Sequence, residues 1–564
     1  MLIRLLKAHL LPHRRALAAL AVLQTAQTVA LLYLPALNAA LIDDGVFKGD
    51  LDRVFRLGGV MLAVTLAQAA GAAVAIRLAT RTATAVGRDV RAEVFAKVQG
   101  LSGGQLARFG TASLITRTVH DVQQVQQFTL SACVVLVPVP IMCVGAVALA
   151  LGHDAPLSAT LLVMTPLLGG ALALVVRGLR PLSVATQLRV DHANRILREQ
   201  ITGIRVIRAF VREEHERRRF ETANHGLADL AVRTGRLQTL LLPLSTTVVN
   251  VFSVAVVWFG ATRVGAGELI AFLAYLTQIV TAVTSGTVVL MTMPRAEVCA
   301  GRIREVLDTE EGFAPPAVPV RTMPARGRVE VRAASFTHPG SLTPALRGVD
   351  LVALPGETTA VIGPTGSGKS TLLALVPRLL DATGGQVLVG GVDVRELDPA
   401  LLSATVALVP QRPFLFSGTV ASTLRYGTPQ AADAELWHAL EVAQARDFVR
   451  SLDHPVTQGG ANLSGGQRQR LTIAGAVLRR PEIYLFDDCF SALDRATEAA
   501  LLAALAEETR GATVVVVAQR VSAVMAADHV VVMDAGRVAG AGTHDELLRD
   551  GGVYREIALS QEPA

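Results

Sequence analysis

The clearest chemical signal in the sequence is a glycine-rich run, Gly363–Ser370, that follows the β-branched stretch Thr359–Ile362. Such a stretch predicts a buried strand, and glycines after it let the backbone fold around an anion so that successive N–H groups point at it. A helix that begins here adds its positive dipole end. We expect Lys369 to reach the β and γ phosphates of a nucleotide and the Ser370 hydroxyl to contact Mg²⁺. The predicted nucleotide-binding residues of this loop are Gly363, Pro364, Thr365, Gly366, Ser367, Gly368, Lys369, Ser370 and Thr371.

A second apolar stretch, Ile483–Asp487, ends in a carboxylate and also predicts a buried strand. In a chain with a phosphate loop, an aspartate at the end of such a strand is the expected partner of Mg²⁺, directly or through water. The alternative is an aspartate that only caps a turn. The two strand ends together predict a site for ATP and Mg²⁺.

The string Leu-Ser-Gly-Gly-Gln occurs twice, at Leu101–Gln105 and at Leu463–Gln467. The second copy lies between the phosphate loop and Asp487, and a helical pattern follows it. With this copy in place, the chain resembles ATP-binding-cassette (ABC) transporters of the exporter-fold half-transporter type over essentially its whole length. The first copy has neither a phosphate loop before it nor a strand ending in Asp after it, so we expect it to form only a helix break.

The resemblance extends to four further segments. Gln411, at the end of the predicted strand Val406–Pro410, matches the Q-loop, which implies a catalytic role and a contact with Mg²⁺. Ser491–Asp494 matches the D-loop. Gly203–Phe210 and Gly110–Asp121 resemble the segments that couple the membrane domain to the cassette.

In this family the signature string acts on the ATP that a second chain holds. The resemblance therefore implies a dimer in which each ATP lies between one phosphate loop and the other chain's signature. Closure then depends on bound ATP, and this difference in affinity between open and closed states can drive a conformational cycle. The residues that the resemblance implies for contact with the second chain's ATP are Ser464, Gly465, Gly466 and Gln467.

The sequence departs from the family at the residues that handle the water and the γ phosphate. Asp488 stands where the family usually has Glu, and a misplacement of about 1 Å can cost roughly 10²-fold in rate. Gln519 replaces the usual His and cannot carry a proton near neutral pH. His338 stands where an aromatic, often Tyr, stacks on adenine, and Gln458–Gly460 lacks a common Glu-Arg pair.

These departures favour a site that binds ATP and hydrolyses it slowly, with Asp488, Gln519 and Gln411 as its catalytic residues. The resemblance to heterodimers of this family suggests a second, non-identical chain that has Glu and His at these positions. This chain's intact signature would then complete the ATP site of that second chain. A slow homodimer is the alternative.

Long uncharged runs identify the rest of the chain as membrane-spanning. Each reaches the roughly 20 residues that a helix needs to cross the hydrocarbon layer. The first run is longer than the apolar core of a secretory signal and is expected to remain in the mature protein. The six runs are Ala16–Ile42, Leu57–Ile76, Val122–Gly152, Ala155–Val176, Leu237–Thr262 and Leu269–Pro294.

Charges around the spans set the predicted orientation. Lys7, Arg14 and Arg15 precede the first span and place the N-terminus in the cytoplasm. The segments 77–121 and 177–236 are rich in arginine and are therefore also expected to face the cytoplasm. The net charge of +6 comes with arginines that flank spans and meet lipid headgroups, which argues against nucleic acid as a partner. Four scattered cysteines give no metal-ligand spacing and no disulfide framework.

The sequence therefore predicts a multi-domain chain. Residues 1–305 form an α-helical transmembrane domain with two long cytoplasmic excursions, 306–326 a linker, and 327–564 an α/β P-loop NTPase domain. We expect a multi-pass protein of the bacterial inner (plasma) membrane with the ATP-binding domain in the cytoplasm.

The predicted function is ATP-driven transport, with export of amphipathic compounds such as drugs, lipids or peptides favoured. The spans carry no charged residue that would mark an ion pathway. Two alternatives remain open at this stage. One is a subunit of an exporter-fold siderophore importer, and the other is an ATP-sensing regulatory subunit that transports nothing.

Overall fold

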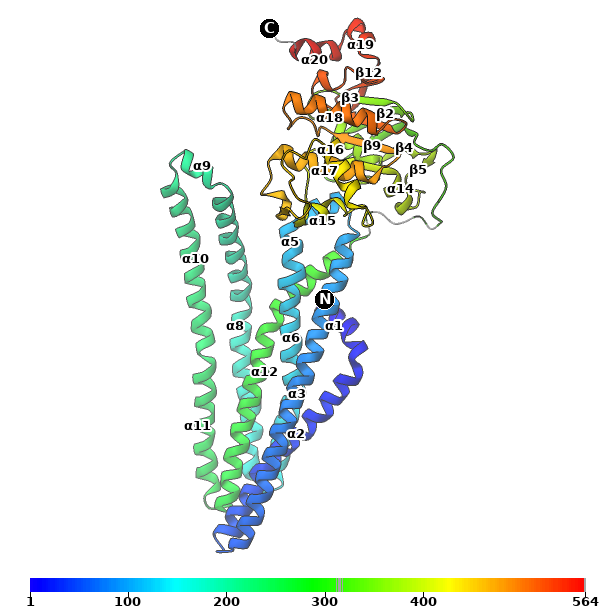
Figure 1. The fold of residues 1–564 in the computed structure, drawn as a ribbon. Helices are drawn as coiled ribbons and strands as arrows, with labels where there is room; N and C mark the ends of the chain where they lie inside the picture. The colour runs from blue at the N-terminus through cyan, green and yellow to red at the C-terminus, as the bar shows by residue number, and fades with distance from the viewer. Residues whose placement is uncertain (311, 313–315, 317, 562–564) are drawn as a thin grey trace. The chain divides into compact units, whose positions relative to one another are not determined.

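The computed structural model describes residues 1–310, 312, 316 and 318–561, which form two compact units (Figure 1). The first unit comprises Met1–Gln99 and Phe109–Glu310. The second comprises Gly100–Arg108 and the described residues after Glu310. The short segment Gly100–Arg108 thus belongs to the second unit, although the residues directly before and after it belong to the first.

All regular secondary structure among the described residues of the first unit is helical. Six of its helical stretches are long and apolar enough to cross a membrane, with mean hydropathy between 1.6 and 2.6: Leu2–Val46, Leu51–Gln99, Thr111–Leu151, Ala155–Thr202, Glu213–Gly260 and Ala266–Leu307. The prediction of six spans is therefore confirmed. At 41 to 49 residues each, these stretches are about twice the length that a bilayer requires.

The helices of the first unit follow one another with short connections. They are α1 (Leu2–Leu10), η1 (Leu11–His13), α2 (Arg14–Ala40), the π-helix η2 (Leu41–Val46), α3 (Leu51–Gln99), α5 (Thr111–Thr116), the π-helix η3 (Arg117–Asp121), α6 (Val122–Val135), α7 (Pro138–Leu151), α8 (Ala155–Thr202), α9 (Ile204–Ala209), α10 (Glu213–Thr239), α11 (Leu241–Gly260) and α12 (Ala266–Leu307). Helix α4 (Gly103–Phe109) stands between α3 and α5.

Helix α12 is the centre of the apolar core in the membrane part of this unit. Phe272, Tyr275, Leu276 and Ile279 recur at helical spacing on one face and are fully buried. They share one cluster with residues of α2, α7, α8 and α11. The last span is therefore the element against which the other spans pack.

Several prolines lie within the spans, and two of them lie four residues after a carbonyl that a glutamine of another helix contacts. Pro35 lies inside α2, and Pro138 starts α7, with two residues between it and the end of α6. A proline has no N–H, so the carbonyl four residues before it loses its helical partner. These carbonyls belong to Leu31 and Val134, and glutamines from other helices supply donors to both.

The two glutamine contacts have similar geometry. Gln278 Nε2 of α12 donates to the Leu31 carbonyl over 3.2 Å. Gln24 Nε2 of α2 donates to the carbonyls of Cys133 and Val134, over 2.8 and 3.3 Å. In a layer without water, such side chains restore bonds that proline removes.

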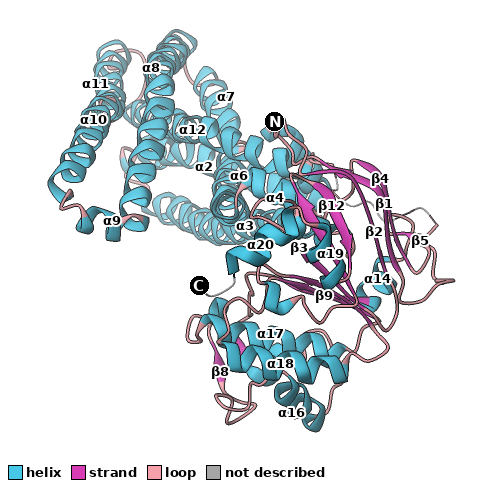
Figure 2. Ribbon diagram, turned by 90° about the horizontal axis from the view of Figure 1, so that it is seen from above, coloured by secondary structure: helices cyan, strands magenta, loops and turns pink. Residues whose placement is uncertain are grey.

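The second unit is built on parallel strands, as the sequence predicts. A six-stranded sheet has the order β12-β11-β3-β10-β9-β6, in which β12 alone pairs antiparallel, and a four-stranded antiparallel sheet has the order β2-β1-β4-β5. Figure 2 shows both sheets with α16, α17 and α18 on one side of the larger one. A small sheet of β7 and β8 completes the strands.

The elements of this unit have the following bounds. They are β1 (Val329–Phe336), β2 (Leu346–Ala353), β3 (Thr358–Ile362), α13 (Lys369–Leu375), β4 (Gly384–Val389), β5 (Val392–Asp393), α14 (Pro399–Thr405), β6 (Val406–Val409), β7 (Gly418–Thr419), α15 (Val420–Leu424), α16 (Asp433–Val442), β8 (Pro455–Val456), η4 (Gln458–Gly460), α17 (Gly465–Arg479), β9 (Ile483–Asp487), α18 (Arg495–Glu508), β10 (Thr513–Val517), η5 (Val521–Ala523), β11 (His529–Asp534), β12 (Arg537–Gly542), α19 (His544–Asp550) and α20 (Val553–Gln561).

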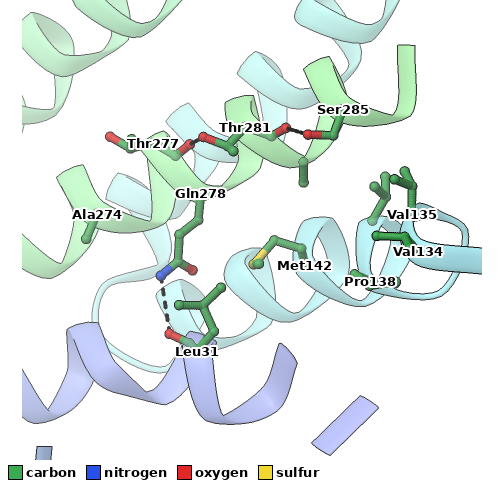
Figure 3. Close-up of a pocket in the computed structure, with 12 residues that line it drawn as sticks. Leu31, Val134, Val135, Pro138, Met142, Ala274, Thr277, Gln278, Thr281 and Ser285 are labelled. Carbon is green, nitrogen blue, oxygen red and sulfur yellow. Dashed lines mark hydrogen bonds between the residues drawn. The ribbon is translucent and has the colours of Figure 1, made fainter. Parts of the chain in front are cut away.

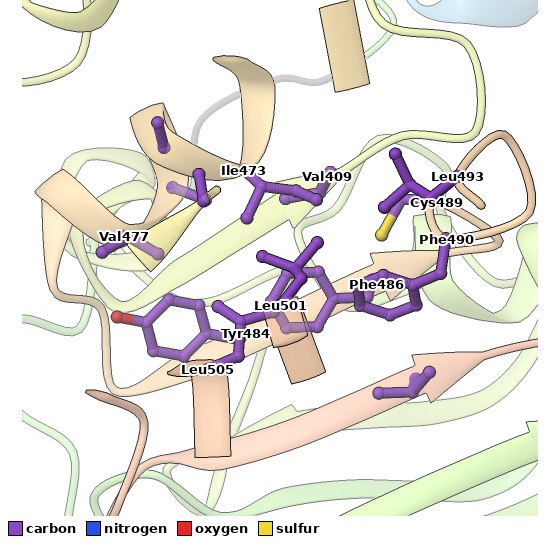
Figure 4. Packing of buried hydrophobic residues seen from close by; sticks show 14 of the residues in the cluster. Val409, Ile473, Val477, Tyr484, Phe486, Cys489, Phe490, Leu493, Leu501 and Leu505 are labelled. Carbon is purple, nitrogen blue, oxygen red and sulfur yellow. The ribbon is translucent and has the colours of Figure 1, made fainter. Parts of the chain in front are cut away.

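Strand β9 shows why the central strands are continuous apolar runs. All five of its residues are buried, because both faces of the sheet are covered. Tyr484 and Phe486 point into the cluster formed with α17 and α18 (Figure 4), whereas Ile483 and Leu485 point into the cluster on the opposite face. The buried strand therefore fixes the position of its last residue, Asp487, at the carboxyl end of the parallel strands.

Candidate functional site

The loop Gly363–Gly368 joins the end of β3 to the start of α13, as the sequence predicts for a phosphate loop. Gly368 has φ +99°, and a Cβ atom there would lie 2.7 Å from the Ala345 carbonyl oxygen. Only glycine fits this combination of backbone angle and close approach. The glycine thus sets the turn from which the first helical N–H groups point into the loop.

Lys369 holds its ammonium group inside that loop. Its Nζ donates to the carbonyls of Gly363 and Pro364, both at 2.7 Å, and to the Ser367 hydroxyl at 3.3 Å. Burial lowers the pKa of Lys369, and the nearby carboxylates of Asp488 and Asp487 oppose that shift. A buried cation at this point suits an anionic ligand.

The structure brings together Ser370 and Asp487, two of the three residues expected to bind Mg²⁺. Ser370 Oγ donates to Asp487 Oδ1 over 2.8 Å. Burial raises the pKa of Asp487, with a smaller rise from Asp488, while the Ser370 bond and Lys369 lower it. A hydroxyl next to a buried carboxylate is an oxygen donor pair that fits Mg²⁺, whose charge would favour the ionised carboxylate.

Asp488 accepts two amide hydrogen bonds on one oxygen. Its Oδ2 receives Gln411 Nε2 at 2.9 Å and Gln519 Nε2 at 2.8 Å. Asp488 is buried, and its backbone is left-handed with φ +47°. Gln411, which the sequence also predicts as a magnesium residue, thus directs its amide N–H to Asp488.

The three predicted catalytic residues meet because of the strand order. Gln411, Asp488 and Gln519 follow β6, β9 and β10, which are neighbours in the parallel sheet. The carboxyl ends of parallel strands share one edge, so side chains just beyond them lie together. The sequence carried this signal, since the three strand ends were recognisable, but the mutual hydrogen bonding was not predicted.

The signature string caps α17. The Ser464 N–H donates to Gln467 Oε1 over 2.9 Å, and the Gln467 N–H donates to Ser464 Oγ over 3.2 Å. Ser464 and Gly465 are exposed, whereas Gly466 lies close to the D-loop, where a Cβ would be 3.2 Å from the Ala492 carbonyl oxygen. The start of α17 is therefore open to another molecule.

Gln469 is a site residue that sequence reasoning missed. It is buried on α17, and its Nε2 donates to the Pro410 carbonyl over 3.1 Å, directly before Gln411. It also bonds to Cys489, next to Asp488. A polar residue on the apolar face of a helix was the available signal. Gln469 thus connects the signature helix to the backbone beside Gln411 and to the residue after Asp488, both predicted catalytic residues.

His338 lies just after β1 and is exposed. Its ring meets Phe336 edge to face, with 4.8 Å between ring centroids. The loop after β1 therefore presents a ring at the surface, as the prediction of an adenine-stacking residue requires.

Fold and site together define a class: a membrane protein with six spans joined to a P-loop ATPase. The sequence pattern of the ABC transporter transmembrane region matches residues 17–283, and the pattern described as ABC transporter matches residues 346–491. The chain belongs to the ABC transporter family. It is a multi-pass half-transporter of the exporter fold, and its ATPase is coupled to transport.

Several relatives extend over most of the chain. An uncharacterized ABC transporter ATP-binding protein of Mycobacterium tuberculosis is 46% identical over 100% of this chain and 98% of its own length. An ATP-dependent lipid A-core flippase of Xanthomonas campestris is 32% identical, over 85% of this chain and 82% of its own. The solved structure of a bacterial Atm1-family ABC exporter with ATP bound shares the fold, with a TM-score of 0.83, 23% identity and 99% of each chain covered.

Proposed function

We propose that this chain exports amphipathic or lipophilic compounds as one subunit of a heterodimer, and that its own ATP site hydrolyses slowly. The relative named as a lipid A-core flippase supports a lipophilic cargo. We place the protein in the bacterial inner membrane, with its N-terminus and cassette in the cytoplasm, on the basis of the basic residues that flank its spans.

The observation that carries the slow site is the pair of amide bonds to Asp488 Oδ2. A general base must reach the attacking water at roughly 2.6–3.2 Å with a free lone pair. Both bonds fall on Oδ2 of a side chain one methylene shorter than Glu and hold it toward the two amides, which leaves Oδ1 to reach a water. Gln519 has no group that could carry a proton near neutral pH. We infer from these two features that hydrolysis at this site is slow.

The remaining residues support nucleotide binding. The phosphate loop and Lys369, whose ammonium group lies in the loop, would hold the phosphates, and the paired Ser370 and Asp487 would hold Mg²⁺. Mg²⁺ there would supply positive charge to the phosphates. His338 provides a ring for the base. We propose that Ser464, Gly465, Gly466 and Gln467 complete the site of the second subunit, which carries Glu and His at the positions of Asp488 and Gln519.

A tandem fusion of two copies of this chain tests the slow site without any partner, because each copy brings an intact signature. With Mg²⁺ and ATP in nanodiscs, the wild-type fusion should bind a fluorescent ATP analogue yet hydrolyse ATP very slowly. The fusion with Asp488→Glu and Gln519→His in both copies should be faster by about 10²-fold. Equal rates for the two fusions would refute the slow site.

The heterodimer has its own test. A tagged copy of the chain, purified from its native membrane in mild detergent, should bring with it a second half-transporter with Glu and His at those two positions. Recovery of this chain with itself alone would contradict the heterodimer and leave the slow homodimer.

A further inference from the structure

A cavity of about 600 Å³ lies within the membrane part of the first unit (Figure 3). Helices α2, α6, α7 and α12 contribute its walls. Most of the lining is apolar, including Leu31, Val135, Pro138 and Met142. This composition suits the hydrocarbon part of a ligand.

The polar part of the lining is a row of hydroxyls on α12. Thr277, Thr281 and Ser285 follow one another at four-residue spacing and therefore share one helix face. Each hydroxyl donates its hydrogen to its own helix, over 3.0, 2.9 and 2.8 Å respectively, to the carbonyls of Leu273, Thr277 and Thr281. A hydroxyl has one hydrogen and two lone pairs, so these oxygens offer the cavity acceptors alone.

Gln278 adds a further acceptor beside this row. Its amide nitrogen is engaged with the Leu31 carbonyl that Pro35 leaves without a helical donor. Its Oε1 is buried and has no hydrogen-bond donor among the described residues. A buried polar atom without a partner is costly, and a donor from a ligand in the cavity that Gln278 lines would relieve that cost.

The twelve described lining residues include no Asp, Glu, Lys, Arg or His. A cationic ligand would find no counter-ion, and an anionic ligand would meet oxygen lone pairs. Burying an unpaired charge in such surroundings is strongly unfavourable. The lining thus selects against charge of either sign.

We propose that this cavity binds an uncharged amphipathic molecule that presents hydroxyl or N–H donors to the row Thr277–Thr281–Ser285 and lays its apolar part against α2 and α7. The inference rests on the proposed export function, for which such a molecule is the cargo. It defines the cargo by its hydrogen-bond donors and its neutrality.

Three matched lipids test this proposal on the full chain in phosphatidylcholine nanodiscs without nucleotide. A monoacylglycerol with a diazirine on its acyl chain is photolysed, and labelled peptides are identified by mass spectrometry. Labelling should map to α2, α7 and α12. Unlabelled 1-monooleoylglycerol should compete at least about tenfold better than its dimethyl ether, which has no donors, and better than oleate, which is anionic. Equal competition by the diol and the diether, or stronger competition by oleate, would overturn the proposal.

Variants of the hydroxyl row on α12 test whether these hydroxyls cause the preference for the diol. Thr277→Val with Thr281→Val and Ser285→Ala should abolish the preference for the diol and keep the competition by the diether, and the single variant Thr281→Val should reduce the preference. Thr292→Val is the control, since the Thr292 hydroxyl on α12 also donates to its own helix, to the Val289 carbonyl three residues before it at 2.8 Å, and does not line the cavity. An unchanged preference in the triple variant refutes the assignment. Because no ATP is present, failure here is distinct from failure of the ATPase tests above.

Discussion

Leu101–Gln105 and Leu463–Gln467 have the same five residues, and each begins a helix in the same way. In the first copy the Ser102 N–H donates to Gln105 Oε1 over 2.9 Å and the Gln105 N–H to Ser102 Oγ over 3.3 Å. The corresponding distances in the second copy are 2.9 and 3.2 Å. Both copies form a reciprocal cap, which is a local property of the string.

The copies differ in what their helices join. The first starts α4, a helix of seven residues, and its Gly104 approaches the side chain of Pro339. The second starts α17, a helix of fifteen residues whose buried Gln469 bonds to the Q-loop backbone. The string therefore specifies the start of a helix. Whether it can take part in ATP chemistry depends on the length of that helix and on the elements that the helix contacts.

The largest expected effect comes from a matched pair of glycines. Gly465 and Gly103 hold the same place in the two copies, and an added Cβ would have no atom within 4 Å at either. Gly465→Asp should lower the ATPase of the complex purified through the tagged chain by at least about 100-fold, because a carboxylate would face a γ phosphate. Gly103→Asp should leave more than half of that activity. A similar loss in both would show that the comparison is wrong.

A medium effect is expected from removing the hydrogen bond between Gln469, on the helix that the second copy begins, and the Pro410 carbonyl. Gln469→Ala leaves the Pro410 carbonyl without its buried donor and frees the backbone next to Gln411. We expect about a tenfold fall in the ATPase of the complex with ATP binding retained. Gln430→Ala, at an exposed position, is the control. Unchanged hydrolysis in Gln469→Ala would mean that α17 acts through its cap alone.

The smallest effect should be the same in both copies. Ser102→Ala and Ser464→Ala each remove the acceptor of one N–H, worth about 1 kcal/mol at a helix start. Hydrogen exchange at the Gln105 and Gln467 amides should accelerate by about fivefold in the respective variants. A much larger change at one amide would show that tertiary contacts, and not the cap, hold that copy.

Much of the architecture was predictable because it depends on long or strongly patterned segments. The uncharged runs predicted six spans, and the phosphate loop and Asp487 were placed by the apolar strands before them. The break between α6 and α7 was not predicted, although Pro138 signalled it, since an uncharged run shows only that a span exists.

Long-range contacts account for the rest. The segment Gly100–Arg108 packs with the second unit, and nothing in its composition indicates this. The bonds from Gln411 and Gln519 to Asp488 depend on strand order, which the sequence does not state. The glutamine contacts to Leu31 and Val134 pair residues more than 100 positions apart along the chain.

The contact between Gln278 and Leu31 also bears on how the protein is made. Ribosomes synthesise the first span well before α12, so the carbonyl released by Pro35 enters the bilayer long before its donor exists. Until α12 is inserted, that carbonyl has to take its hydrogen bond from another donor, such as water. The bond from Gln278 can therefore form only once all six spans are present.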